Sequence, residues 1–202
     1  MTILSAALLL FLVMDPLGNI PLFMTTLKRV DKKRRPKVVL RELFFALIIL
    51  VGFLFLGQYL LRALHISETA LTTAGGIILM LIAIKMIFPS RSSSLEEDVD
   101  GEPFLVPLAI PYVAGPSAMA TALLLISREP SRWLDWLLAV LIAWFASALI
   151  IYFASYFAKF LGEKGLIAIE RLMGMLLVTV AVQMILSGLS EYLAAGIDKA
   201  AK

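Results

Sequence analysis

The chain has 202 residues, of which 61% are hydrophobic and 16% charged, and its mean hydropathy is +0.95. This composition excludes a water-soluble globular domain, and the length leaves no room for one beside six or seven crossings of about 20 residues each. Zero cysteines and one histidine exclude disulfides and thiolate metal sites, and the net charge of +3 does not indicate nucleic-acid binding, because the basic residues concentrate in one short loop.

Six apolar segments predict an all-α membrane protein. We expect transmembrane helices at 2–27, 43–61, 71–88, 104–126, 134–157 and 172–189. The first and fourth segments are predicted to be broken helices, because each carries prolines and glycines that a continuous helix does not accommodate. These residues are Asp15, Pro16, Gly18, Asn19 and Pro21 in the first segment, and Pro107, Pro111, Gly115 and Pro116 in the fourth.

The distribution of Lys and Arg predicts the orientation, because cytoplasmic loops are enriched in these residues. The loop at 28–41 holds eight of them, and twelve fall on its side of the membrane against five on the other. Both termini are therefore expected outside the cytoplasm (N-out, C-out), in the bacterial inner membrane. The acidic stretch at 96–102 falls on the cytoplasmic side, but acidic residues contribute little to orientation.

The two halves of the chain are predicted to be repeats. A shift of 98 residues aligns the third helix with the sixth, without a gap, at Ala70 and Ala168, Gly76 and Gly174, Ala83 and Ala181, Met86 and Met184, and Ile87 and Ile185. Because each unit holds three crossings, the second enters the membrane inverted. We expect repeats at 1–90 and 103–202, joined by a polar cytoplasmic connector at 91–102. The alternative is that apolar helices match by composition alone.

Breaks in a membrane helix predict a binding site, because unwound backbone survives at membrane depth only beside protein or a water-filled cavity. The half-helix after a break offers free N–H groups, and the half before it offers carbonyls, so a zwitterion can use both. We expect substrate contacts from Asp15, Pro16, Gly18, Asn19 and Pro21 in the first repeat, and from Pro111, Gly115, Pro116, Ser117 and Thr121 in the second.

Asp15 is the one carboxylate expected at the centre of the site. It precedes Pro16 as an N-cap residue does, and Asn19 before Ile20 and Pro21 offers a second candidate helix start. Asp15 either caps the half-helix alone or also binds a coupling cation or proton.

Other residues of the apolar segments keep two interpretations. Lys85 and Gln183 are equivalent in the repeat, and Lys85 either acts in function or extends its amine to the cytoplasmic interface. Gly75, Gly76 and Gly174 are predicted to serve close helix packing rather than ligand contact.

Five motifs carry a resemblance that covers nearly the whole chain: MDPLGNIPLF (14–23), RELFFAL (41–47), GGIILMLIAIKMIFPS (75–90), VPLAIPYVAGP (106–116), and LGEKG (161–165) with ERLMG (170–174). With them the chain resembles the MarC family of bacterial inner-membrane proteins, most closely its YhgN-type members. The family is similar to the SnatA-type neutral amino acid transporters. This implies six helices, inverted repeats and substrates such as glycine or alanine. Ser117 stands where family members often have glycine.

The function expected is a secondary transporter of small neutral, zwitterionic solutes by alternating access, with Asp15 as the candidate proton-coupling group. The alternatives are a passive channel or facilitator and a non-transporting membrane scaffold. An intramembrane enzyme is disfavoured, because no second acid, histidine or cysteine is expected near Asp15. The expected partners are a small-molecule substrate and membrane lipid, with no cofactor, metal or nucleic acid, and an oligomer is left open.

Overall fold

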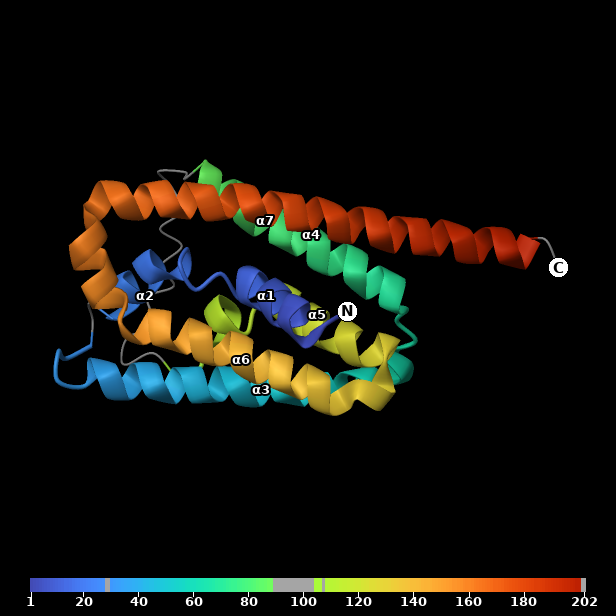
Figure 1. Cartoon of the computed structure of the whole chain (residues 1–202), viewed down its shortest axis with the longest axis horizontal. Helices are drawn as coiled ribbons and strands as arrows, with labels where there is room; N and C mark the ends of the chain where they lie inside the picture. The colour runs from blue at the N-terminus through green and yellow to red at the C-terminus, as the bar shows by residue number, and fades with distance from the viewer. Residues whose placement is uncertain (28–29, 89–103, 107, 201–202) are drawn as a thin grey trace.

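The computed structural model describes residues 1–27, 30–88, 104–106 and 108–200, and these residues form a succession of helices. In chain order the elements are α1 (Ile3–Met14), α2 (Asn19–Leu27), α3 (Arg35–Leu64), α4 (Glu68–Ile87), the π-helical turn η1 (Leu108–Val113), α5 (Pro116–Arg128), the 3-10 turn η2 (Pro130–Arg132), α6 (Trp133–Tyr152) and α7 (Ala154–Ala200) (Figure 1). Within the described residues there is no β-strand, only an isolated bridge between Phe104 and Val106. The prediction of an all-helical protein is confirmed.

Four helical stretches are long and apolar enough to cross a membrane. They are α3, α4, Pro130–Tyr152, which joins η2 to α6, and Lys164–Ala194 of α7. The pair α1 and α2 makes a fifth if it is counted as one span, bent by 49°. The fourth predicted segment, now η1 and α5, is not among these spans. The chain is therefore a helical membrane protein with four to five candidate spans.

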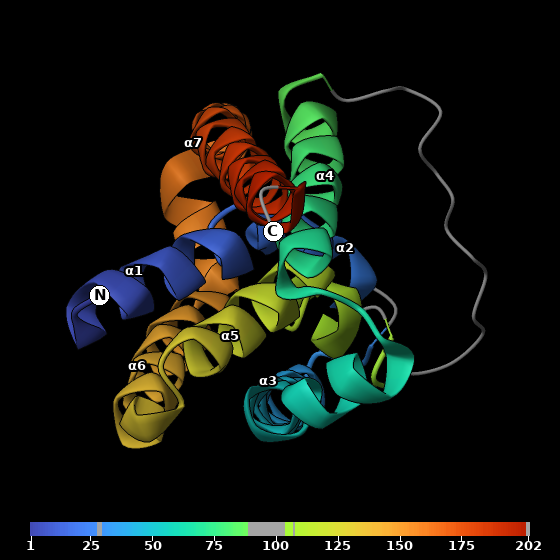
Figure 2. The same ribbon diagram turned by 90° about the vertical axis from the view of Figure 1, so that its right-hand side faces the viewer.

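The helices form three layers, as Figures 1 and 2 show: α3 and α6 on one side, α4 and α7 on the other, and α1 and α5 between them. In α5, eight of 13 residues are buried. The outer helices instead expose large apolar side chains, such as Phe44 and Phe145, which lipid can cover. The buried polar side chains Asp15, Asn19 and Ser117 belong to the middle layer and its connections.

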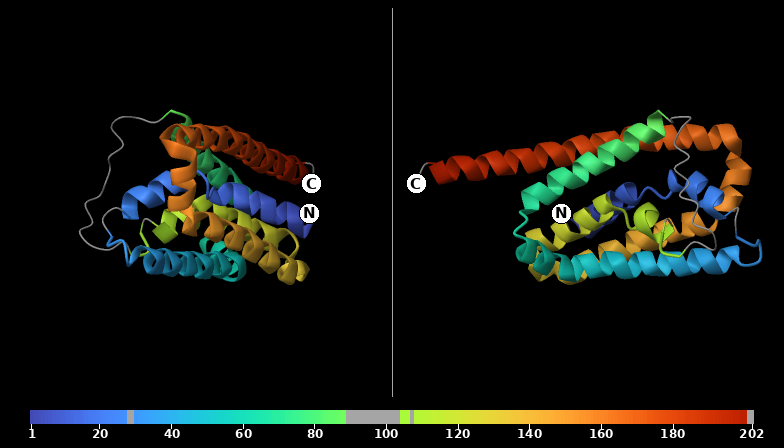
Figure 3. Two further views of the ribbon diagram at one scale, coloured as in Figure 1. Left: turned by 60° about the vertical axis from the view of Figure 1, so that its left-hand side comes forward. Right: turned by 180° about the vertical axis from the view of Figure 1, so that it is seen from behind.

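The α4–α7 pair crosses closely through small residues, and Figure 3 shows the two helices running alongside each other. A Cβ added to Gly76 would lie 2.9 Å from the carbonyl oxygen of Ala181, and one added to Gly174 would lie 3.1 Å from that of Ala83. Gly75 faces the Ala120 and Met184 side chains, each 3.1 Å from its Cβ position. All three predicted packing glycines thus lie at helix contacts, where missing side chains let backbones approach.

Several helix bounds differ from the sequence prediction. Helix α3 begins at Arg35, eight residues before the apolar segment at 43–61, and Pro36 stands in its first turn. Helix α7 covers the stretch 158–171 that was expected to be a loop, and it bends at Gly162, whose φ is +67°. An apolar run predicts only the part of a helix that lies in the membrane. The backbone hydrogen bonds of the helix can continue beyond that run into polar sequence. The predicted connector at 91–102 lies outside the described residues.

Candidate functional site

The first interruption lies between α1 and α2 and is built around Asp15. Asp15 adopts a left-handed conformation (φ 44°, ψ 59°), which aspartate tolerates better than most residues, and its N–H donates to the carbonyls of Phe11 and Leu12. Its Oδ1 accepts the N–H of Gly18 at 3.1 Å, and its carbonyl accepts the N–H of Asn19 at 3.1 Å. Asp15 is therefore the C-cap of α1, and the expectation that it is the N-cap of a helix beginning at Pro16 was wrong, because residues 16–18 form a turn and α2 begins at Asn19, the second candidate start.

The turn after Asp15 is packed too tightly for a side chain at position 18. A Cβ added to Gly18 would overlap the carboxylate of Asp15 and the Cε of Met86 on α4. Pro16 is buried in the same turn, while Pro21, the third residue of α2, is half-buried. Glycine is thus required here for a close approach, and α4 contacts the first interruption through Met86.

The second interruption lies between η1 and α5. Ile110 has extended backbone angles (φ −123°, ψ 127°) inside η1, and the N–H of Ala114 donates to the carbonyl of Ala109, five residues back. Gly115 is also extended (φ −73°, ψ 161°), and α5 begins at Pro116. No side chain caps this helix start. Pro111 lies within η1 and Gly115 lies between η1 and α5, so both fall in the irregular stretch, while Pro107 lies outside the described residues.

Asn19 joins the two interruptions directly. Its amide Nδ2 donates to the carbonyl of Met14, the last residue of α1, at 2.9 Å, and to the carbonyl of Tyr112 in η1 at 2.6 Å. Both carbonyls belong to helix ends that lack a complete set of intrahelical partners. The Tyr112 ring also packs against Phe23 of α2, with 6.1 Å between ring centroids. Segments 93 residues apart in the sequence therefore meet through one side-chain amide.

The polar side chains at the interruptions are closed off from solvent. Asp15 is 6% exposed, Asn19 9%, Ser117 2% and Thr121 4%. Thr121 donates its hydroxyl to the carbonyl of Ser117 at 2.8 Å, one helical turn earlier in α5. The site is thus a buried polar region in a helical bundle whose outer face is apolar, and its carbonyls are partly satisfied by Asn19.

The lengths of the half-helices indicate where the interruptions lie along the bundle. The outer ends of α1 and α5 meet at η2, where Arg132 donates to the carbonyl of Met1 at 2.9 Å and where the span Pro130–Tyr152 begins. From there α1 has 12 residues and α5 has 13. At a rise of 1.5 Å per residue these half-helices are about 18–20 Å long, which is shorter than an apolar layer about 30 Å thick, so neither half-helix crosses such a layer alone.

The structure adds residues that sequence reasoning did not assign to the site. Tyr112 supplies a carbonyl and a ring, and Met86 covers Gly18. Glu170, which sequence reasoning assigned to a loop, lies within helix α7. It was assigned to a loop because it lies between the apolar segments predicted at 134–157 and 172–189, whereas α7 extends through it.

Glu42 was also missed, and it positions the approach to the second interruption. This carboxylate is 0% exposed, its Oε1 lies 2.8 Å from Nη2 of Arg41, and its Oε2 accepts the N–H of Leu105 at 2.9 Å. The Arg41 guanidinium lies over the Phe104 ring, 5.1 Å from its centroid. The Glu42 carboxylate pairs with a guanidinium through one oxygen and accepts a backbone N–H through the other. It thereby holds residues 104–106 against α3, just before η1.

Two polar residues that sequence reasoning left open are exposed, unlike the polar side chains at the interruptions. Lys85, in the last turn of α4, is exposed, and Gln183 is exposed on α7, where it donates to Ser187 at 3.2 Å. An exposed lysine near a helix end agrees with a side chain that extends to the membrane interface. Among the described residues no group of three His, Cys, Asp or Glu side chains could hold a metal ion.

Comparison with known proteins gives a consistent family. A family profile described as MarC family integral membrane protein matches residues 1–193. UPF0056 inner membrane protein YhgN of Escherichia coli K12 is 48% identical over 192 residues, 95% of this chain and 98% of the relative. UPF0056 membrane proteins of Buchnera aphidicola subsp. Schizaphis graminum and of Chlamydia pneumoniae are 48% and 36% identical over 191 residues each, with 94% and 93% of this chain and 97% and 94% of the relatives covered.

No solved structure matches the chain. The family assignment therefore depends on sequence similarity, which covers almost the full length on both sides. The chain belongs to the MarC family of integral membrane proteins and, like its Escherichia coli relative, is a multi-pass protein of the inner membrane.

Proposed function

We propose that the protein is a secondary transporter of small neutral, zwitterionic solutes, such as glycine or alanine, and that it works by alternating access. The observation that carries the proposal is the junction made by Asn19, whose amide holds the carbonyls of Met14 and Tyr112 from two interrupted segments. Unwound backbone beside buried polar side chains is how transporters build binding sites within a membrane. A bundle that served only as a scaffold would not need buried polar groups, which are costly to keep in an apolar layer.

The two interruptions offer complementary partners to a zwitterion. The carboxylate of Asp15 would bind an ammonium group. The start of α5 has no side-chain cap, so its free N–H groups and positive dipole end would bind a carboxylate. Ser117 and Thr121 line the first turns of α5, where their bulk would restrict the solute to a small side chain. A solute with one positive and one negative charge could bind Asp15 and the start of α5 at the same time.

The contacts between helices support two inverted three-helix repeats at 1–90 and 103–202. Gly76 approaches Ala181, Met184 and Ile185, while Gly174 approaches the corresponding Ala83, Met86 and Ile87. A shift of 98 residues exchanges these two sets, as a two-fold axis between α4 and α7 requires. The same exchange relates other helix pairs, because α1 packs on α6 and η1 on α3, and α2 packs on α7 and α5 on α4. We propose that η1 and α5 together form one crossing, which makes six spans, and that both termini lie outside the cytoplasm, as the distribution of Lys and Arg predicts.

Alternating access in this arrangement would require the Asn19 junction to open. The described arrangement is closed at the interruptions, because Asp15, Asn19, Ser117 and Thr121 are all at most 9% exposed. A bound zwitterion would compete for the carbonyls that Asn19 holds, and the repeats would then rock about the α4–α7 contact. A ligand drives such a change only if it binds the two conformations with different affinity.

The test is counterflow of radiolabelled L-alanine and glycine in proteoliposomes of the purified protein. We expect uptake against internal unlabelled alanine, without ion conductance, and we expect Asn19→Ala to abolish it while Gln183→Ala has no effect. Net conductance or uptake that does not need internal alanine would indicate a channel or facilitator. Absence of uptake for all small amino acids would favour the scaffold. An imposed pH gradient that accelerates uptake in the parent but not in Asp15→Asn would assign proton coupling to Asp15.

A further inference from the structure

A pocket lies at one end of the bundle, away from the interruptions. It is bounded by the last turns of α3, the start of α4, the end of α5 and η2, and it has a volume of about 450 Å³. That volume falls within the range of small-molecule sites, roughly 300–1,000 Å³. The pocket lies at the ends of the α3 and α4 spans, where the polypeptide leaves the apolar layer. It therefore lies where two candidate spans are joined by a short loop.

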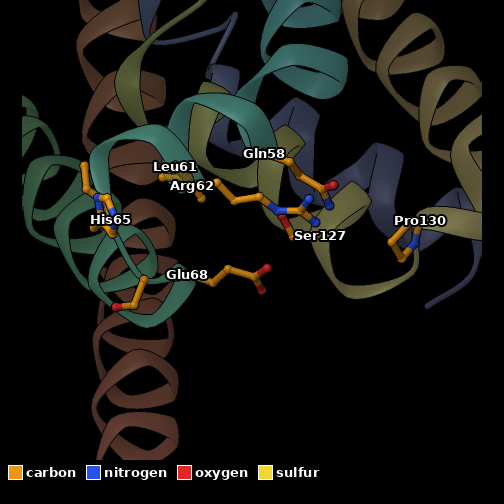
Figure 4. A pocket seen from close by; sticks show the side chains of 9 residues that line it. Gln58, Leu61, Arg62, His65, Glu68, Ser127 and Pro130 are labelled. Carbon is orange, nitrogen blue, oxygen red and sulfur yellow. The ribbon is translucent and has the colours of Figure 1, made fainter.

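Two opposite charges face this pocket without a protein partner. Arg62 of α3 and Glu68 of α4 both line it, and in the part of the chain that the structure describes neither side chain makes a hydrogen bond or an ion pair. Figure 4 shows the guanidinium of Arg62, the amide of Gln58 and the carboxylate of Glu68 pointing toward the same space beside Ser127. Opposite charges that converge on a space but do not pair can each bind part of a ligand.

Ser127 adds an unsatisfied hydroxyl to the pocket wall. Its Oγ is buried and, within the described residues, is the one buried side-chain oxygen or nitrogen that has no hydrogen-bond partner. Almost all buried polar atoms in proteins have a partner, so an exception points to a missing one. Rotation about the Cα–Cβ bond would turn this hydroxyl toward a polar ligand in the pocket. The wall therefore has a donor and acceptor to offer beside the two charges.

We propose that this pocket is a second, peripheral binding site for the same class of small zwitterion, occupied before the solute reaches the interruptions. The planar guanidinium of Arg62 would bind the carboxylate in a two-pronged contact, and Glu68 would bind the ammonium group. Leu61 and Ile66 line the pocket and would contact a short apolar side chain. A simple anion would be repelled by Glu68 and a simple cation by Arg62, which leaves the zwitterion as the ligand class.

The position of the pocket fits a place on the solute's path. Helix α5 starts at the second interruption with Pro116 and ends beside the pocket, with Ser127 in its last turn. Eleven helical residues separate the two ends, about 16 Å at 1.5 Å per residue. The peripheral site and the central site would thus be the two ends of one short helix. This role of the pocket rests on the proposed transport function, although the binding itself does not.

The test follows hydrogen–deuterium exchange of the purified full-length protein with L-alanine, and with propionate and ethylamine as probes that each lack one charged group. We expect alanine alone to slow exchange in the loop between α3 and α4. Arg62→Gln and Glu68→Gln should each raise the alanine concentration for half-maximal protection about tenfold or more, because each removes a charge-assisted hydrogen bond. Arg128→Gln removes an equal charge beside Ser127 and should change nothing, since Arg128 pairs with Glu191 outside the pocket.

The double variant Arg62→Glu with Glu68→Arg distinguishes ligand binding from a folding defect. It reverses both charges, so it should restore protection that each single reversal loses. Protection by propionate or ethylamine alone would overturn the zwitterion assignment. Protection at 14–19 and 112–121 but not in the loop would overturn the peripheral site and leave the transport proposal intact. Protection in the loop without any counterflow would retain the pocket as a zwitterion site and overturn the proposed function.

Discussion

The two interruptions differ in how their free backbone groups are satisfied. At the first, Asp15 closes the turn itself, because its N–H completes α1 and its carboxylate accepts the N–H of Gly18. At the second, Gly115 precedes α5 and no side chain caps the helix. The charged interruption is therefore internally bonded, and the uncharged one leaves donors for a ligand. In the proposed mechanism the first interruption binds the ammonium group of a zwitterion and the second binds its carboxylate.

Helices α4 and α7, the last helices of the two halves, make equivalent contacts, whereas the two interruptions differ. Gly76 and Gly174 make equivalent contacts across the α4–α7 crossing, down to the same methionine and isoleucine partners. An interface of this kind tolerates the same small set of residues on both sides, because each backbone fills the space that the other leaves. In the proposed mechanism the symmetric crossing carries the motion, and the asymmetric interruptions carry recognition.

The largest effect is expected from Asn19→Leu, which removes the link between the interruptions at nearly constant volume. The carbonyls of Met14 and Tyr112 would each lose a buried donor, at about 1–3 kcal/mol each, so the free energy of unfolding should fall by about 2–6 kcal/mol. Counterflow should be lost as well. Unfolding in mixed micelles measures the first effect. Gln183→Leu, an exposed amide on α7, is the control and should change stability by less than about 0.5 kcal/mol.

Gly18→Ala tests whether the first interruption depends on close packing. The added methyl group would overlap the Asp15 carboxylate and Met86, and the free energy of unfolding should fall by about 1–3 kcal/mol. Gly52→Ala is a matched control, because its Cβ meets nothing within 4 Å in the middle of α3. That variant should be neutral or slightly stabilising, as alanine favours helix. Equal melting temperatures for the two variants would contradict the packing at Gly18.

The existence of the interruptions was predictable, whereas their junction was not. Pro16, Gly18 and Pro21 within one apolar run disfavour a continuous helix by local rules alone, and α1 does end at Met14. The bond from Asn19 to Tyr112 depends on how α2 and η1 approach each other in space, and local sequence rules carry no signal for that approach. The sequence therefore predicts which residues interrupt the helices, but only the tertiary structure shows which of these residues contact each other.

Two buried or partly buried glutamates were likewise not predictable from the sequence. Glu170 and Glu42 were not assigned to any site, because both lie outside the predicted apolar segments and Glu42 directly follows the basic stretch that ends at Arg41. In the structure α7 extends through Glu170, and Glu42 is fully buried between Arg41 and the N–H of Leu105. Hydropathy windows average over a turn or more, so they cannot distinguish a carboxylate that faces the bundle from one that faces water.

Asp15→Asn separates the charge of the first interruption from its geometry. The asparagine oxygen can still accept the N–H of Gly18, so stability should change by less than about 1 kcal/mol. Counterflow of alanine should fall about tenfold or more, because the ammonium group loses a charged partner. Asp15→Ala should lose both transport and stability, since it also removes the cap. If Asp15→Asn transports like the parent and Asp15→Ala does not, the carboxylate serves capping alone.

The smallest effects should come from Gly76→Ala and Gly174→Ala, and their equality matters more than their size. Each methyl group meets a carbonyl oxygen of the facing helix, at 2.9 Å from Ala181 and 3.1 Å from Ala83, so each should cost about 1 kcal/mol as the backbones separate. If a two-fold axis relates α4 to α7, the two costs should agree within about 0.5 kcal/mol, which is within the usual scatter for independent sites. Unequal costs would mean that the two sides of the α4–α7 crossing are packed differently. The sequence match between the two halves would then not reflect an equivalent role in the proposed motion. If the two variants lose equal stability but transport alanine at different rates, each methyl group obstructs a different step of alternating access, either the outward-to-inward or the inward-to-outward change.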